Sequence, residues 1–250
     1  MTETQKIKMY GGKIIINFTE KDWGGKKIHS YTNDKGEKLI SVTQITGTID
    51  KSNALIIWAT RLMGKYLADN FLDKTLTSEA LEMSLKEWRK AKEEAADIGS
   101  AIHDWIEQKI KGLEPAIPED DKVKNGVLAF LKWQNENKIK WLETEKIVYS
   151  KKYNFVGKLD AIAKINGKTC LIDYKSSKGI YPEFYLQTAA YQLAYEEEHG
   201  KKLDGRILIH LGKEDGVFET IEANDKKDSK AFLGLLEAKK RLLELDKWSK

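Results

Sequence analysis

Cysteine and proline are scarce in this sequence. A single cysteine, Cys170, and three prolines, Pro115, Pro118 and Pro182, occur in 250 residues. One thiol cannot form an internal disulfide or supply a metal cluster held by several cysteines, so we expect a reducing, cytoplasmic setting. Long apolar runs are also missing, and the N-terminal segment MTETQKIKMYGGK lacks the apolar core of a signal peptide, so no membrane association is expected.

Neither sign of charge is in large excess. Lysine and arginine number 43 against 39 aspartates and glutamates, which gives a net charge of +4. This excess permits a nucleic-acid partner without requiring one. The hydrophobic fraction of 41% is enough for a core, and 250 residues fit one large domain that includes any accessory layer.

Hydrophobic periodicity divides the chain into three parts. Residues 1–49 hold short expected strands, at 13–18, 26–31 and 37–43. Residues 50–140 have a helical pattern, with helices expected from Asp50 or Ser52, over 78–111 and over 121–138. In residues 141–250 the expected elements are strands at 144–152, 154–165 and 168–175, a helix at 182–199, strands at 205–212 and 217–223, and a helix at 226–246. This order predicts an α/β fold with a mixed central sheet flanked by helices and an N-terminal helical accessory region.

Two carboxylates lie in the hairpin predicted at 154–175. Asn166-Gly167 is typical of a two-residue hairpin turn, which pairs Ile165 with Lys168 and, counting outward, Asp160 with Asp173. Side chains alternate along a strand, so the core face is expected to carry Leu159, Ala161, Ala163, Ile165, Cys170, Ile172 and Tyr174. The opposite face is expected to carry Asp160, Ile162, Leu171, Asp173 and Lys175.

Opposed carboxylates need a reason to face each other. With Cβ atoms roughly 5 Å apart they repel, unless a cation lies between them or they share a proton. A divalent ion is the simplest solution, because carboxylate oxygens suit Mg²⁺ or Mn²⁺. Lys175 lies on the same face, where its ammonium could bind an anion or polarise a water. The alternative is an exposed salt-bridge ladder in which Asp160 pairs with Lys158 or Lys175.

Two helices add further polar residues. His103 lies outside the apolar stripe of its predicted helix, and Gly99, one turn earlier, leaves room for a backbone or a ligand to approach. Gln187 and Tyr191 are four residues apart and share one helix face. Each feature has a plain structural alternative, namely a partly exposed histidine and a tyrosine that packs in its helix stripe.

Taken in order, four segments resemble the motifs of the PD-(D/E)XK nuclease superfamily, and of its RecB-type branch in particular. They are GSAIH (99–103), GKLD (157–160), IDYK (172–175) and QTAAY (187–191). SVTQIT (41–46) followed by ALIIWA (54–59) is similar to mitochondrial genome-maintenance exonucleases and their phage-encoded relatives. The resemblance spans about residues 37–195 and implies a mixed sheet flanked by helices.

The resemblance also implies roles for the matching residues. The implied metal ligands are His103, Asp160, Asp173 and the backbone carbonyl of Tyr174. Lys175 would orient the attacking water or stabilise the transition state, while Gln187 and Tyr191 would hold the substrate strand or the active-site geometry. Some RecB-type relatives bind an iron–sulphur cluster through four cysteines; one cysteine cannot do so, and no cluster is expected. Whether one or two ions bind stays open, and Glu145 and Glu107 are either further ligands or solvated glutamates.

Contacts to DNA are expected from residues near the cleft. Lys151 and Lys152 precede the Asp160 strand, and Lys178 follows Lys175 closely. Such lysines would bind the phosphate backbone independently of sequence. Hydroxyl contacts to the phosphates are expected from Ser41 and Thr43, although the segment SVTQIT also fits the end of an ordinary strand. By analogy with the family, the block 50–140 is expected to form a wall or roof over the cleft.

The leading interpretation is a metal-dependent DNA exonuclease that acts mainly on single strands or ends, in recombination, repair or phage DNA processing. A recombination protein is an implied partner. One alternative is a structure-specific or restriction-like endonuclease on the same fold. Another is a catalytically silent nucleic-acid-binding module, against which the intact set of Asp160, Asp173 and Lys175 argues.

Overall fold

Two sheets and six helices make up the part of the chain that the computed structural model describes, residues 2–23, 26–72 and 74–248. The strands are β1 (Thr2–Met9), β2 (Ile14–Trp23), β3 (Lys26–Asn33), β4 (Ile40–Ser41), β5 (Ile139–Ser150), β6 (Phe155–Ile165), β7 (Lys168–Lys175), β8 (Gly205–Leu211) and β9 (Phe218–Glu222). The helices are α1 (Val42–Thr46), α2 (Ser52–Phe71), α3 (Ser78–Ile110), α4 (Asp121–Glu136), α5 (Pro182–His199) and α6 (Lys227–Trp248). None of these helices is long and apolar enough to cross a membrane.

The central sheet is mixed, as the order of elements predicts. Its strands run β4-β6-β7-β8-β9, with β5 paired to the other edge of β6. The β6–β7 pair is antiparallel and the β7–β8 pair is parallel, because α5 carries the chain across one face of the sheet between them. Pro182 at the start of α5 and Gly200 in the left-handed conformation at its end set the bounds of this helix, which match the predicted 182–199.

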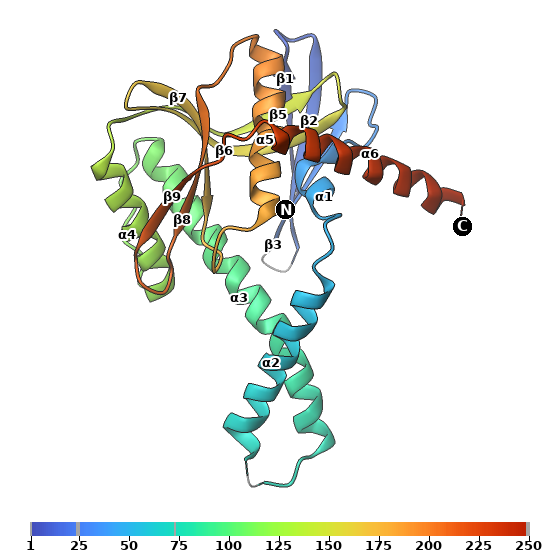
Figure 1. Cartoon of the computed structure of the whole chain (residues 1–250), viewed down its shortest axis with the longest axis vertical. Helices are drawn as coiled ribbons and strands as arrows, with labels where there is room; N and C mark the ends of the chain where they lie inside the picture. The colour runs from blue at the N-terminus through green and yellow to red at the C-terminus, as the bar shows by residue number, and fades with distance from the viewer. Residues whose placement is uncertain (1, 24–25, 73, 249–250) are drawn as a thin grey trace.

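Helices cover both faces of the central sheet (Figure 1). On one face, α3 and α4 bury a cluster that includes Ile102, Phe130 and Tyr174. On the other face, α1, α5 and α6 bury a second cluster, to which Ile162 and Leu171 contribute. The expectation that only one face of the hairpin is core is therefore wrong, because α5 and α6 exclude water from the face that also carries the carboxylates.

The N-terminal strands form a separate sheet in the order β1-β2-β3. It packs on the central sheet through Ile16 and Phe18 against Val156 and neighbouring residues of β5. The strand at 2–9 was not expected. The strand expected at 37–43 is also wrong beyond Ser41, because Ser41 accepts a hydrogen bond from Gln44 N and the Gln44 side chain accepts one from Ser41 N. This reciprocal cap starts α1.

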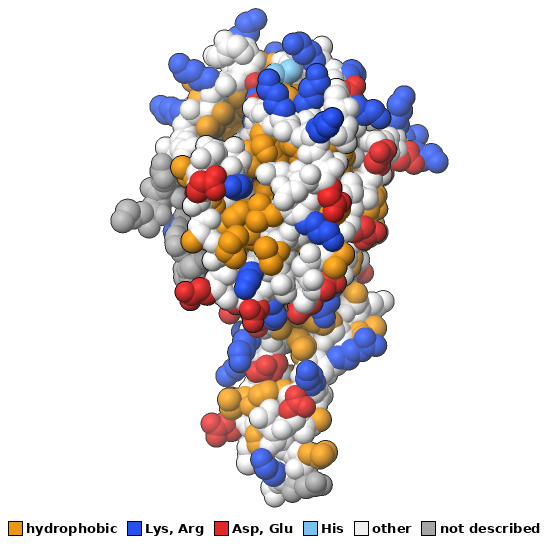
Figure 2. All heavy atoms as spheres, turned by 90° about the vertical axis from the view of Figure 1, so that its left-hand side faces the viewer, with side chains coloured by type: hydrophobic (Ala, Val, Ile, Leu, Met, Phe, Trp, Pro, Cys, Tyr) orange, Lys and Arg blue, Asp and Glu red, His pale blue; other side chains and the backbone are white. Residues whose placement is uncertain are grey.

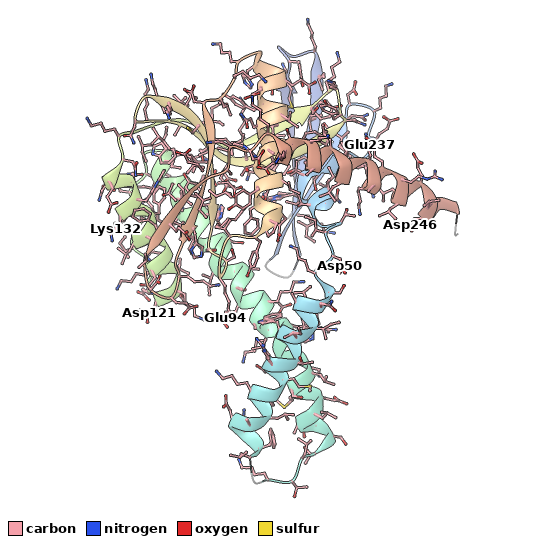
Figure 3. All side chains as sticks on the ribbon, viewed as in Figure 1. Asp50, Glu94, Asp121, Lys132, Glu237 and Asp246 are labelled. Carbon is pink, nitrogen blue, oxygen red and sulfur yellow. The ribbon has the colours of Figure 1, made fainter. Side chains whose placement is uncertain are left out.

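The expected helical block, residues 50–140, does not act as one roof. In Figure 1, α2 and the first half of α3 form an antiparallel hairpin that projects from the body, whereas α4 lies against the sheet. No residue of α2 is buried. Figure 2 shows apolar and charged side chains side by side on the projecting part, and Figure 3 places Asp50 where the hairpin leaves the body. The second half of α3 carries His103 back to the sheet.

Candidate active site

The hairpin between β6 and β7 has the predicted register. Asn166 and Gly167 have φ values of 49° and 94°, as a turn with two left-handed residues requires. Pairing then runs outward from Ile165–Lys168 to Ala161–Ile172. This turn therefore sets which residues of the two strands lie side by side.

The ladder ends one residue before the two carboxylates. The Tyr174 N–H donates instead to the Asp160 side chain, with 2.8 Å between N and Oδ2. On the opposite edge of β6, the Thr144 hydroxyl donates to the Asp160 carbonyl at 3.1 Å. Asp160 and Asp173 are thus neighbours on strands that separate at this point, and the expected direct cross-strand pair is corrected to this arrangement.

Strand alternation also shifts at Asp160. Leu159 belongs to the cluster under α5 and α6, whereas Ala161 belongs to the cluster under α3 and α4. The prediction that both lie on one face is wrong. The neighbouring strand is irregular at the same level, where Glu145, beside Asp160, has a positive φ of 52°. Such a conformation interrupts the regular pleat.

Asp173 is fully buried, with a side-chain exposure of 0%. Neither of its oxygens accepts a hydrogen bond of regular geometry from the described residues. The Lys175 ammonium lies 2.6 Å from Oδ2. Burial raises the pKa of Asp173 to about 6, because the charge of Lys175 opposes this effect only in part and Asp160 adds to it. The carboxylate is therefore only partly compensated: Oδ2 is paired with Lys175, whereas Oδ1 has no partner among the described residues.

His103 comes from α3 and lies beside Asp160. Its Nε2 is 3.1 Å from the Tyr174 carbonyl oxygen, and since a carbonyl only accepts, Nε2 carries the proton. Nδ1 keeps its lone pair and lies 3.7 Å from Asp160 Oδ2. Burial, and then the charge of Lys175, lower the pKa of His103, so the ring is neutral at pH 7. Gly99 permits this approach, because a Cβ there would lie 3.3 Å from Ser176 Oγ.

Glu145 belongs to the same group of side chains. Ligand atoms of His103, Glu145 and Asp160 all lie within 4.8 Å of one another. Burial raises the pKa of Glu145, and the charge of Asp160 raises it further. The reading of Glu145 as a solvated glutamate is thus wrong. Glu107 lies at the same cavity but pairs with Lys111.

Lys175 is held from two sides. Besides Asp173, its Nζ lies 3.4 Å from Gln187 Oε1, and Gln187 Nε2 donates to the Tyr191 hydroxyl at 2.9 Å. Burial alone would lower the pKa of Lys175, but the charges of Asp173 and Asp160 outweigh it and the pKa is raised. Lys175 therefore stays an ammonium. Gly157 leaves room for the Tyr191 ring, which a Cβ would approach to 2.4 Å.

Most of these residues line one cavity of about 1320 Å³. Its walls come from β1, α3, β5 and α5, so segments far apart in the chain enclose it. The site residues in its lining are His103, Glu145, Asp160, Tyr174, Lys175, Gln187 and Tyr191. Asp173 is not in this lining, so the groups that meet at the cavity are the Asp160 carboxylate, the neutral imidazole of His103 and the Lys175 ammonium.

A family model described as the PD-(D/E)XK nuclease superfamily matches residues 119–248. The chain belongs to this superfamily. A search of curated proteins finds no match. Among solved structures, the chain is similar to one described as the crystal structure of SSO0001, with 18% identity over 78% of this chain and 88% of that chain. The TM-score of 0.37 is too low to support an argument.

PD-(D/E)XK nucleases use divalent metals, and the residues present fit such an ion. The buried Asp173 carboxylate has one cation beside Oδ2, the Lys175 ammonium, while Oδ1 has no partner among the described residues, and a further cation would stabilise it. Carboxylate oxygens with one imidazole nitrogen suit Mg²⁺ or Mn²⁺. Asp160, Asp173 and the Nδ1 of His103 would hold the ion. The Tyr174 carbonyl already accepts from His103 and retains a second lone pair.

Most of the residues expected to contact DNA in this PD-(D/E)XK nuclease do not line the cavity. Thr43 lines the cavity; Ser41, Lys151, Lys152 and Lys178 are not in its described lining. The Ser41 hydroxyl caps α1, and Lys151 and Lys152 lie in the β5–β6 turn. That turn is about 20 Å of strand from Asp160. Lys178 is close enough to Lys213, which does line the cavity, to lower its pKa, although burial has the larger effect. These contacts stay predictions.

Proposed function

We propose that this nuclease is a divalent-metal-dependent DNA exonuclease of the RecB type. It acts mainly on single strands or DNA ends, in recombination, repair or phage DNA processing. The observation that carries the proposal is the buried Asp173 carboxylate, which has no regular hydrogen-bond donor among the described residues and lies beside Asp160 and Lys175. A binding module gains nothing from burying such a group, whereas a metal-dependent nuclease needs it.

Phosphodiester hydrolysis requires an activated water and stabilisation of the charge on the phosphoryl group. A bound divalent ion supplies both when present. The protein supplies a fixed positive charge, because the raised pKa of Lys175 prevents it from acting as a base near neutral pH. The Lys175 ammonium pairs with the Asp173 carboxylate and donates one hydrogen bond to Gln187 Oε1. The third ammonium proton is free to donate to the phosphate or the attacking water.

Gln187 and Tyr191 position Lys175. The amide of Gln187 accepts from Lys175 and donates to Tyr191, so its orientation is fixed from both ends. The Tyr191 ring occupies the space left by Gly157 and belongs to the same buried cluster as Val42. Through these contacts, the packing of α5 on β6 fixes the position of the Lys175 ammonium.

The charge of the cavity supports a single-stranded substrate. Four lysines of its lining form ion pairs with carboxylates: Lys111, Lys146, Lys158 and Lys175. Duplex DNA carries dense charge on both strands and is usually bound by a broad basic face. A single strand needs a narrower basic path with rings for stacking, and Phe184 lies in this lining with Lys175 Nζ 4.6 Å from its ring centre.

The deciding experiment compares a linear single strand with a closed single-stranded circle of the same sequence, at equal Mg²⁺ and salt. We expect the linear strand to be degraded to short products and the circle to survive. Blunt duplex should be cut slowly, and faster near frayed ends. Equal nicking of the circle would replace the exonuclease by the endonuclease alternative, and binding of both substrates without cleavage would favour the silent module.

A further inference from the structure

Glu145 has a backbone conformation that its strand does not require. Its φ is 52°, although the residues on either side pair regularly, Thr144 with Ala161 and Lys146 with Leu159. A left-handed conformation is unfavourable for a residue with a long side chain. In this conformation the Glu145 side chain joins His103 and Asp160 instead of following the alternation of β5.

The distances in this group are close to those of a metal site. Two ligands on opposite sides of an octahedral Mg²⁺ are about 4.2 Å apart, since each bond is about 2.1 Å. The ligand atoms of His103, Glu145 and Asp160 lie within 4.8 Å of one another. Only one pair of the three can be opposite, and adjacent ligands are about 3.0 Å apart, so side-chain movements of about an ångström would bring all three to one ion.

The Lys158 ammonium pairs with Glu145, and both side chains are about one-fifth exposed, 23% and 20%. It therefore neutralises Glu145 when no metal is bound. Lys158 also has a second favourable contact, because its Nζ lies 5.9 Å from the ring centre of Phe18. A cation over this ring is stabilised without Glu145. The ammonium can thus leave the carboxylate without losing every favourable contact.

An independent observation points to a cation at this place. Asp173, on the strand next to Asp160, is completely buried; its Oδ2 pairs with the Lys175 ammonium, and its Oδ1 has no partner among the described residues. We propose that Glu145, supplied by β5, is a further ligand of the divalent ion, and that Lys158 is the internal counter-ion that the metal displaces. This proposal rests on the proposed metal-dependent function and adds a residue to its site.

The test is direct titration of the purified protein with Mn²⁺ or Mg²⁺ by calorimetry, together with the shift in melting temperature that the metal causes. Glu145→Gln should weaken metal binding by about tenfold or more, because a ligand is lost. The matched control is Glu143→Gln. Glu143 lies on the same strand and lines the same cavity, but it pairs with Lys146 outside the group. This control should bind metal within about twofold of the parent.

Lys158→Met gives a result of opposite sign. It should strengthen metal binding several-fold, because the ion no longer competes with the ammonium for Glu145. In the Glu145→Gln background this gain should disappear, since the competition has no carboxylate left to act on. Lys146→Met is the matched control and should leave the affinity unchanged. Lys158→Met also tests the proposal if Glu145→Gln fails to fold.

Each remaining outcome overturns the proposal. Parental affinity in Glu145→Gln, with binding lost in Asp173→Asn, would remove Glu145 from the site and leave the proposed function standing. A full gain from Lys158→Met in the Glu145→Gln background would mean that Lys158 acts by general charge, not as the counter-ion. No metal binding by the parent would overturn both this proposal and the proposed function.

Discussion

At the scale of single residues, Asp173 shows how function and stability oppose each other. Its carboxylate is buried without regular hydrogen bonds from the described residues, and its pKa rises from 3.8 to about 6. At about 1.4 kcal/mol per pKa unit, ionising this group at pH 7 destabilises the metal-free protein by about 3 kcal/mol. The Lys175 ammonium thus offsets only part of the cost of this buried charge, as a site for a further cation would require.

Asp173→Asn should abolish cleavage and leave the fold intact. In EDTA its free energy of unfolding should be unchanged or raised by up to about 2 kcal/mol, because the buried charge is removed while Lys175 loses its partner. Denaturant unfolding with circular dichroism measures this. A large loss of stability together with lost activity would indicate that Asp173 has a structural role.

The same substitution should change the dependence of stability on pH. The folded pKa of Asp173 lies above its unfolded value, so the folded protein binds the extra proton and is stabilised below pH 4. This contribution is lost as the pH rises from about 4 to about 6. His103, whose pKa is lowered, has the opposite effect below pH 6.5 in both proteins. The difference between parent and Asp173→Asn in EDTA should therefore grow from pH 4 to pH 6; a constant difference would contradict the account.

At the scale of elements, local chemistry predicts some features and misses others. The Asn166-Gly167 turn and the bounds of α5 follow from residues that allow few alternatives. The helix at Val42–Thr46 was missed, although the Ser41–Gln44 capping box is a usable signal. The break at Asp160 was not predictable, because no local pattern in the sequence marks it or the positive φ of Glu145 in the neighbouring strand.

The contact between β6 and α5 should be sensitive at Gly157. A methyl group there would lie 2.4 Å from the Tyr191 ring, so Gly157→Ala should destabilise the protein by about 1 to 3 kcal/mol. Because Tyr191 holds Gln187 and Gln187 holds Lys175, cleavage should fall by more than metal affinity does. The control is Gly234→Ala in α6, where a Cβ meets open space and stability should not fall. Unchanged stability of Gly157→Ala would contradict the packing described.

The projecting hairpin should be dispensable for the fold. The Tyr66 hydroxyl lies 3.8 Å from Met83 Sδ, which places residue 58 opposite residue 91 across the α2–α3 pair. Replacing 58–91 by a short Gly-Ser linker removes two buried residues from the described part of this range, Ala80 and Ser84, so the melting temperature should change little. Affinity for long single strands should fall several-fold if the hairpin guides the substrate, as filter binding would show. Loss of the folded body would assign the hairpin to the core instead.

At the scale of the whole molecule, the site is assembled from segments that the sequence separates widely. The superfamily match covers residues 119–248, whereas His103 comes from α3 and a further cavity wall comes from β1. The order of the motifs was enough to predict the α/β fold and to select Asp160, Asp173, Lys175 and His103 as candidate site residues. It was not enough to predict the outward course of the α2–α3 hairpin, because helical periodicity does not define a direction in space.

The most direct test of the account is cleavage of an end-labelled single-stranded DNA with Mg²⁺, with Mn²⁺ and with EDTA, by the parent and by Asp173→Asn. The account predicts degradation by the parent with either metal, none in EDTA, and none by Asp173→Asn under any condition, although the variant is folded. Cleavage in EDTA, or cleavage by Asp173→Asn at the parental rate, would contradict it.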